Sequence, residues 1–242
     1  ESVLMRYPGR ITLCVSSQAG CGMNCPFCAT GQAGLTRNMS AAEIVDQVVR
    51  ANQAIARGEL GGKRSTDQSL ERVSNIVFMG MGEPLANYAR VMQAVRVMTD
   101  KKHGMGMSAR GITVSTVGLV PAITKLAAED IPVTFALSLH APDDELRDEL
   151  VPINRKYPLA ELMGACDRYV QDKQRRAHVV YEYVLLNGVN DNPEQARALV
   201  RLLADRPAKI NLIPFNAFDG SGYTRPDEAR IRRFQDMLHN KG

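Results

Sequence analysis

Several features that mark particular classes of protein are scarce or missing in this 242-residue sequence. Tryptophan is absent and aromatic residues make up 5% of the chain, which argues against a base-stacking platform of the kind single-strand binders use. No run of about 18 apolar residues occurs, so we expect no membrane span. The first residues lack the pattern of a signal peptide. These absences favour a globular, cytoplasmic protein.

Cysteine is also scarce, and its distribution argues against a disulfide scaffold. Five cysteines is an odd number, four of them crowd one end, and a chain this long builds its own core. Cysteines without stapling partners suit a reducing cytosol. The net charge of +4 permits a nucleic-acid partner but does not require one.

The stretch G-C-G-M-N-C-P-F-C-A-T-G holds three of the cysteines, Cys21, Cys25 and Cys28, at C-x3-C-x2-C spacing. Glycines around them leave the loop free to wrap a small inorganic centre. A [4Fe–4S] cluster has four irons, so three thiolates would leave one iron open to a substrate or cofactor. A closed zinc site with Cys14 as fourth ligand is the less favoured alternative, because no second C-x2-C pair exists.

Strand and helix patterns alternate along the chain after a short lead-in, Glu1–Gly9. We expect strands over Arg10–Gln18, Val73–Met79, Ile112–Ser115, Pro132–Leu139, Ala177–Leu185 and Lys209–Pro214. We expect helices over Ser40–Arg57, Asn87–Lys102, Leu119–Glu129, Asp143–Leu150, Pro158–Lys173, Asn192–Ala204 and Pro226–Asn240. Ser40 and Glu43 have capping-box spacing.

Six strands alternating with helices predict an α/β fold with a parallel sheet, and their apolar composition predicts burial on both faces. Six units are too few for a closed eight-fold barrel, so an open partial barrel fits. The polar motif residues fall at or just past strand carboxyl ends, the edge that holds the active site in α/β barrels. We therefore expect them to share one cavity.

The triple-cysteine motif, with Phe27 before its third cysteine, is similar to the signature of the radical S-adenosylmethionine (SAM) enzymes. The sequence around this motif resembles that of the RlmN family of dual-specificity rRNA and tRNA adenine-C2 methyltransferases. The resembling blocks include T-L-C-V-S-S-Q-A-G-C, M-G-M-G-E-P-L, V-S-T-V-G-L-V-P, L-S-L-H-A-P, R-x-x-L-V-P-I-N-R and N-L-I-P-F-N. Together they run from Glu1 to about Asn216.

This resemblance implies a (β/α)6 partial barrel that forms one catalytic core over residues 1–242. It implies a [4Fe–4S] cluster on the three clustered cysteines and SAM as the second cofactor. The SAM-binding positions that it implies are Gly82, Glu83, Ser115, Ser138, Leu139, His140 and Asn216. Taken alone, each of these has an ordinary structural interpretation, such as a strand-ending turn or a core histidine.

The resemblance also implies two catalytic residues, Glu1 as a general base and Cys14 as a resolving cysteine that forms a transient disulfide. In the family, the partner of that disulfide is a methyl-carrying cysteine in a segment beyond the last helix. Cys166 does not match it, because it lies mid-helix and suits a small buried hydrophobe. We therefore expect a core without the family's N-terminal domain and C-terminal cysteine segment, which binds its cofactors without completing methylation.

The partners implied are 23S rRNA and tRNA as substrates and a flavodoxin or ferredoxin as electron donor. The enzyme itself is expected to be a monomer. Three basic clusters are candidate RNA contacts: Lys63-Arg64, Lys173 with Arg175 and Arg176, and Arg230 with Arg232 and Arg233. A C8-methylating resistance enzyme shares the cluster and both cysteines and is the nearest rival. A glycyl-radical activase and a non-catalytic, metal-containing RNA-binding module are two more distant hypotheses.

Overall fold

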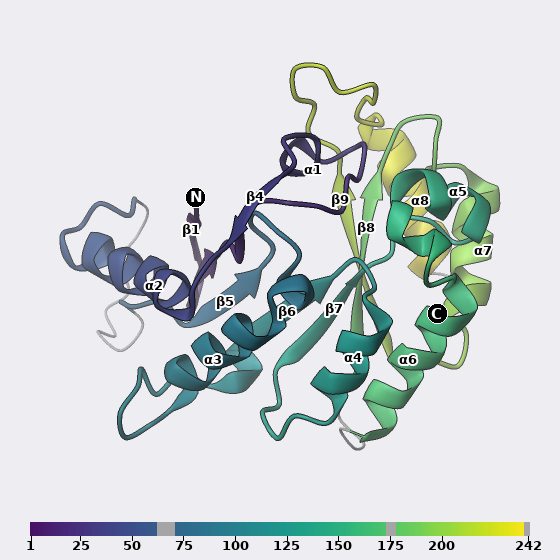
Figure 1. Cartoon of the computed structure of the whole chain (residues 1–242). Coiled ribbons are helices and arrows are strands. Elements are labelled where there is room, and N and C mark those ends of the chain that lie inside the picture. Colours follow the sequence, from purple (N-terminus) through teal and green to yellow (C-terminus); the bar gives the residue numbers. More distant parts are fainter. Residues whose placement is uncertain (62–70, 173–177, 240–242) are drawn as a thin grey trace. The chain divides into compact units, whose positions relative to one another are not determined.

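Strands and helices alternate along the chain in the computed structural model, which describes residues 1–61, 71–172 and 178–239 (Figure 1). The larger sheet has the strand order β1-β2-β5-β6-β7-β8-β9. Its strands are β1 (Val3–Tyr7), β2 (Arg10–Cys14), β5 (Asn75–Phe78), β6 (Ile112–Thr116), β7 (Thr134–Ser138), β8 (Val179–Leu185) and β9 (Ala208–Pro214). The α/β class and its parallel sheet are confirmed.

The predicted helices are all present, with ends that differ by a few residues. They are α2 (Ala41–Ala56), α3 (Tyr88–Thr99), α4 (Val120–Ala127), α5 (Asp144–Leu150), α6 (Leu159–Asp172), α7 (Pro193–Leu203) and α8 (Glu228–His239). Asn192 and Ser40 each cap their helix with a reciprocal capping box, so the local signal at Ser40 and Glu43 is confirmed.

The chain forms two compact units that interleave in the sequence. Unit 1 contains Glu1–Gly22, Leu35–Ser115 and Glu129–Phe135. In it, β2 pairs parallel to β5 and β5 parallel to β6, while α2 and α3 pack side by side (Figure 1). Its core is mainly aliphatic, with Leu13, Ile44 and Ile76 at most 1% exposed.

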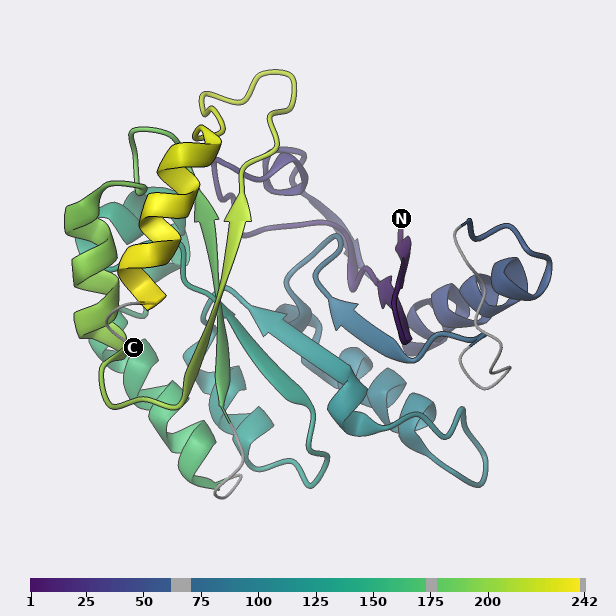
Figure 2. The same cartoon turned by 180° about the vertical axis from the view of Figure 1, so that it is seen from behind.

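Unit 2 contains Met23–Gly34, Thr116–Ala128 and Ala136–Gly242. Here β8 pairs parallel to β9 over seven residues, and α7 lies beside α8 (Figure 2). Helix α4 packs on α6. A buried apolar cluster lies under the carboxyl ends of its strands and includes Cys25, Leu150, Val184 and Phe215.

Three local predictions need correction. The lead-in contains a strand, because Val3–Tyr7 pairs antiparallel with Arg10–Cys14 across a turn whose Gly9 has a φ of +75°. The strand predicted to reach Gln18 ends at Cys14, and Gln18–Gly20 instead forms β3, which pairs with β4 (Leu35–Asn38). The cysteine motif therefore lies within a short hairpin, in which Ala29–Gln32 forms the one-turn helix α1.

Burial of every strand on both faces is also wrong for β9. Four of its seven residues are exposed, including Ile213 at 37%. Strand β9 is the last in the sheet order, and among the described residues no strand pairs with its outer edge. By contrast, β8 has six buried residues of seven and matches the prediction.

Candidate active site

The predicted site residues lie at the carboxyl ends of parallel strands in each unit. In unit 1, Cys14 ends β2, Gly82 and Glu83 follow β5, and Ser115 lies near the end of β6. The strand pairing of unit 1 brings these three ends to one edge. In unit 2, Ser138, Leu139 and His140 end or follow β7, and Asn216 follows β9. These are the ends that hold active sites in α/β folds.

Cys14 ends β2, and Glu1 lies two residues before β1, the strand that pairs with β2 in unit 1. Val3 is the register partner of Cys14, and the main-chain oxygen of Glu1 accepts a hydrogen bond from Ser16 Oγ. Glu1 itself is exposed, whereas Cys14 is half-buried. Burial raises the pKa of the Cys14 thiol above its usual 9.0, opposed by a hydrogen bond with the Met79 backbone. The thiol is therefore protonated at neutral pH.

The loop that carries Gly82 and Glu83 lies directly against the segment that follows β2. Glu83 is 3% exposed, and its carboxylate accepts the backbone N–H of Leu85 at 2.9 Å. Its own N–H donates to Gln18 Oε1 at 2.8 Å. Gly82 has a φ of +100°, and a Cβ there would lie 2.5 Å from the Cβ of Gln18. Only glycine allows this approach.

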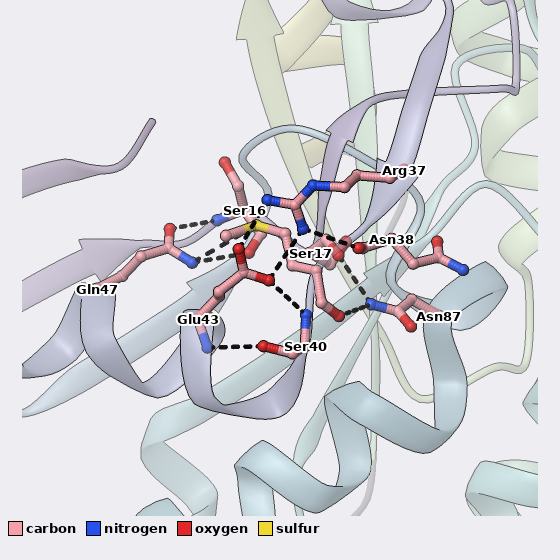
Figure 3. Close-up of polar contacts among 9 residues, drawn as sticks. Ser16, Ser17, Arg37, Asn38, Ser40, Glu43, Gln47 and Asn87 are labelled. Carbon is pink, nitrogen blue, oxygen red and sulfur yellow. Dashed lines mark hydrogen bonds and ion pairs between the residues drawn. The ribbon is translucent and has the colours of Figure 1, made fainter.

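Two side-chain amides hold the backbone of Ser16 and Ser17, the residues that follow β2 (Figure 3). Gln47 clamps the backbone of Ser16 at both its N–H and its carbonyl, each at 2.9 Å. Asn87 donates to the carbonyls of Ser17 and Met39 at 2.9 and 2.8 Å. These clamps fix the backbone between β2 and the first cysteine of the motif.

The second and third cysteines of the motif belong to unit 2. Cys25 is 5% exposed, and its carbonyl accepts the Cys28 N–H at 3.1 Å and the Gln32 side chain at 3.1 Å. Gly31 lies so close that an added Cβ would be 3.1 Å from the Cys25 nitrogen. The turn is thus tightly closed around Cys25, and Cys28 remains half-buried.

The three thiols are divided between the units, since Cys21 belongs to unit 1. Across the described ranges, no group of three or more His, Cys, Asp or Glu side chains forms a ready metal site. None of the five cysteines forms a disulfide. Cys21 precedes a glycine-lined turn that contains Cys25 and Cys28, and three such thiols are chemically suited to hold an iron–sulfur cluster. In the described structure, Ser17 Oγ is a buried polar atom without a hydrogen-bond partner. The cluster site stays a prediction.

Arg147 of α5 supports the segment Ser138–His140 from the protein interior. This arginine is fully buried and donates to the carbonyls of Leu139 at 3.0 Å and Ser138 at 3.2 Å, and also to the Val117 carbonyl. A further bond of 2.7 Å goes to Asn154 Oδ1. Burial lowers the pKa of Arg147 to about 10, so the side chain remains cationic at neutral pH.

His140 is a neutral side chain with a fixed tautomer. Its Nδ1 accepts the backbone N–H of Val184 at 3.1 Å, which leaves the proton on Nε2. Burial, together with the nearby charge of Arg147, lowers the pKa of His140 to about 3. Its φ of +62° is a strained value for a histidine, and Phe27 meets its ring edge-on at 4.9 Å between centroids.

The remaining site positions differ in burial. Ser115 is 6% exposed on β6, whereas Asn216 is exposed beyond β9. Cys166 is fully buried in α6, and burial raises the pKa of its thiol to about 12. Its interpretation as a small buried hydrophobe is confirmed.

Sequence reasoning missed the residues that hold these loops, namely Gln18, Asn87, Arg147, Asn154 and Asn190. Arg147 had two available signals: it begins the block R-x-x-L-V-P-I-N-R, to which no role was assigned, and it falls on the apolar side of a helix, where a charge demands partners. Asn190 donates to the His140 carbonyl at 2.8 Å from a loop 50 residues away, and nothing local to either residue predicts that contact.

Of the three basic clusters, only the one on α8 lies within the described residues. Lys63-Arg64 and the cluster of Lys173, Arg175 and Arg176 lie outside them. Arg230 is engaged by Asp191 at 3.2 Å and by Asn187 at 3.0 Å. Arg232 and Arg233 are exposed. Among the described helices, none is long and apolar enough to cross a membrane.

Comparison with protein families and curated proteins identifies the relatives of this chain. The family described as the radical SAM superfamily matches residues 15–200. A probable dual-specificity RNA methyltransferase RlmN from Thermobifida fusca is 59% identical over the whole chain, and one from Frankia alni is 56% identical. The chain spans 64% and 56% of the length of these two relatives.

Solved structures agree with these sequence relationships. A radical SAM methyltransferase from Sphaerobacter thermophilus matches with a TM-score of 0.91 and 47% identity, covering all of this chain and 67% of that protein. A structure of TYW1 with a lysine-pyruvate adduct matches with a TM-score of 0.65 at 17% identity, over 97% of this chain and 74% of that one. The latter similarity concerns the fold alone.

Proposed function

The chain belongs to the radical SAM superfamily, and within it to the RlmN family, and from this premise we propose that the intact protein methylates C2 of specific adenosines in 23S rRNA and tRNA. Identity of 56–59% over the whole chain to proteins named as RlmN methyltransferases is the observation that carries this proposal. The arrangement of the motif residues at strand carboxyl ends supports it.

Two cofactors belong to the proposal, a [4Fe–4S] cluster held by Cys21, Cys25 and Cys28, and SAM. When bound, they supply a carbon radical, which C2 of adenine requires because this carbon is electron-poor and not nucleophilic. The chain's own residues would hold these two cofactors, orient them and shield them from water. The tight turn at Gly31 and the apolar packing around Cys25 keep two of the thiols in a water-poor setting.

The SAM positions have chemistry that suits a zwitterionic amino acid joined to a nucleoside. Gly82 permits a ligand to approach the backbone, and the buried carboxylate of Glu83 complements an ammonium group. His140 offers a neutral Nε2–H donor, since its Nδ1 is occupied. The polar groups of Ser115, Ser138 and Asn216 suit ribose hydroxyls, the carboxylate and adenine.

We assign Cys14 the role of resolving thiol and Glu1 that of general base that removes the C2 proton. Because the pKa of Cys14 is raised, its thiol must lose a proton before it attacks the sulfur of the methyl-carrying cysteine to form the transient disulfide. Glu1 is exposed just before β1, where a flipped adenine base can reach it. The substrates are RNAs with an unpaired target base. The electron donor is a flavodoxin or ferredoxin, and the enzyme is a monomer in the cytoplasm.

The proposal is tested in two stages with the intact protein, reconstituted anaerobically with iron and sulfide. Electron paramagnetic resonance (EPR) of the reduced protein should show a [4Fe–4S] signal that changes when SAM is added. RNA treated with the enzyme and digested to nucleosides should then contain 2-methyladenosine by mass spectrometry. Cys28→Ala should abolish both results, while Cys166→Ala serves as a matched cysteine control. A product of 8-methyladenosine would contradict the C2 assignment, and an EPR-silent zinc protein would contradict the enzyme itself.

A further inference from the structure

Gln18 occupies an unusual position between the cysteine motif and the loop of Gly82 and Glu83. It is the first residue of β3, three residues before Cys21, and is only 2% exposed. A buried primary amide is costly unless both its oxygen and its nitrogen find partners. The partners of the Gln18 side chain therefore indicate what it does.

Each end of the Gln18 amide is used once. Oε1 accepts the backbone N–H of Glu83 at 2.8 Å, and Nε2 donates to Asn38 Oδ1 at 2.7 Å. Asn38 is also the register partner of Gln18 in the β3–β4 hairpin that brackets the cysteine motif. One side chain thus connects the base of that hairpin to the backbone of Glu83.

The contact is close as well as polar. The backbone nitrogens of Ser17 and Gln18 both donate to the Met81 carbonyl, at 2.9 and 3.2 Å. A Cβ on Gly82 would lie 2.8 Å from the Gln18 nitrogen, in addition to its overlap with the Gln18 side chain. Glu83 therefore cannot shift without moving Gln18, and the reverse also holds.

We propose that Gln18 is a positioning residue that sets the place of Gly82 and Glu83 relative to the start of the cysteine motif, and thereby the orientation of bound SAM. This inference rests on the proposed function, since it assumes that Glu83 receives the SAM ammonium group. In this proposal Gln18 does not contact SAM and takes no part in the chemical step.

The chain provides a matched control in Gln47. Its amide also makes two hydrogen bonds to this segment, but both go to the backbone of Ser16 and neither reaches Gly82 or Glu83. A purely structural role for Gln18 predicts that replacing either glutamine has similar consequences. A positioning role predicts that only Gln18 affects SAM.

The test compares Gln18→Met, Gln18→Glu and Gln47→Met in the intact, reconstituted protein. Iron content and midpoint of urea unfolding report on the structure, and SAM titration of the reduced-cluster EPR signal reports on positioning. We expect Gln18→Met to keep its iron and to require about tenfold more SAM, the effect of one lost hydrogen bond to a buried group. Gln18→Glu keeps the acceptor for the Glu83 N–H and should recover part of this loss.

Each result has a definite meaning. Equal SAM dependence in Gln18→Met and Gln47→Met would overturn the inference and leave the proposed function intact. Loss of iron in Gln18→Met but not in Gln47→Met would also overturn it, because Gln18 would then support the cluster loop itself. Absence of any SAM response in the unmodified protein would instead contradict the proposed function.

Discussion

Unit 1 and unit 2 hold their site loops with different chemistry. In unit 1, the neutral amides of Gln47 and Asn87 bind the backbone of Ser16 and Ser17 (Figure 3), and the amide of Gln18 binds the backbone of Glu83. In unit 2, the charged guanidinium of Arg147 gathers several carbonyls beneath Ser138–His140. Hydrogen bonds from a charged group are about twice as strong as neutral ones, but the charge is costly to bury.

This difference has consequences for robustness. The clamps of unit 1 are distributed over several side chains that do not titrate, so each single loss is small. Unit 2 concentrates its support in one arginine and one neutral histidine, which makes it sensitive to substitution and to acid. Four substitutions test this contrast.

The largest effect is expected for Arg147→Met. It removes the hydrogen bonds that the buried guanidinium donates to the carbonyls of Leu139 and Val117 and to Asn154 Oδ1, while the Leu139 carbonyl keeps the Ala141 N–H at 2.8 Å. We expect unfolding in urea to show a loss of about 4 kcal/mol or more, since each hydrogen bond to a charged group contributes about 1.5–3 kcal/mol. Arg147→Lys keeps the positive charge but not the several N–H donors of the guanidinium group. Its loss of unfolding free energy should lie between those of the unmodified protein and Arg147→Met. The exposed Arg168→Met is the control, and a comparable loss there would contradict the contrast.

Gly82→Ala should have the next largest effect and is the most severe single change in unit 1. The left-handed φ of +100° and the 2.5 Å approach to Gln18 Cβ leave no space for a methyl group. We expect a loss of about 3 kcal/mol in unfolding free energy from strain and overlap. Gly61→Ala, with no atom within 4 Å of the added Cβ, is the matched control and should change little. A tolerant Gly82 would mean that the loop can move away from Gln18.

His140 should make unit 2 sensitive to acid. Its pKa is about 3 in the folded chain, whereas the unfolded chain takes up the proton near its ordinary value of 6.5. Stability from this group is therefore complete above pH 6.5 and falls as pH drops toward 3. Glu182, whose pKa burial raises, acts in the opposite direction.

His140→Asn isolates this effect, because asparagine can accept the Val184 N–H and tolerates a positive φ. Between pH 7 and pH 4.5, the decrease in unfolding free energy should be smaller in the variant by on the order of 2 kcal/mol. The exposed His178→Asn should show the full decrease. Equal decreases in all three proteins would show that His140 is not held neutral.

The smallest effect is expected at the N-cap of α2. Ser40 Oγ accepts the Glu43 N–H at 3.2 Å, and its own N–H donates to the Glu43 carboxylate at 2.8 Å. Ser40→Ala should cost about 1 kcal/mol in urea unfolding. Ser108→Ala is the control, since Ser108 precedes a short helix without a capping bond from its side chain. A larger loss at Ser40 would show that the capping box also supports the clamp of Gln47 on Ser16.

The limits of sequence reasoning follow the range of the interactions. The βα alternation and the end of each helix depend on residues a few positions apart, and the sequence predicted them well. Strand β1 was missed although its sequence V-L-M-R-Y is mostly apolar, because so short a run does not by itself specify a strand and only its pairing with β2 defines it. The hairpin around the cysteines was missed because the exposed β4 segment carries no burial pattern.

By itself, then, the sequence determined the α/β class, the helix caps and the family, because periodicity, capping and motif text are local properties. Only the tertiary structure decided that Gln18 supports Glu83, 65 residues away, and that Arg147 supports Ser138–His140 from inside the core. A buried polar side chain is stable only where the folded chain supplies its partners, and those partners come from elements that are distant in sequence.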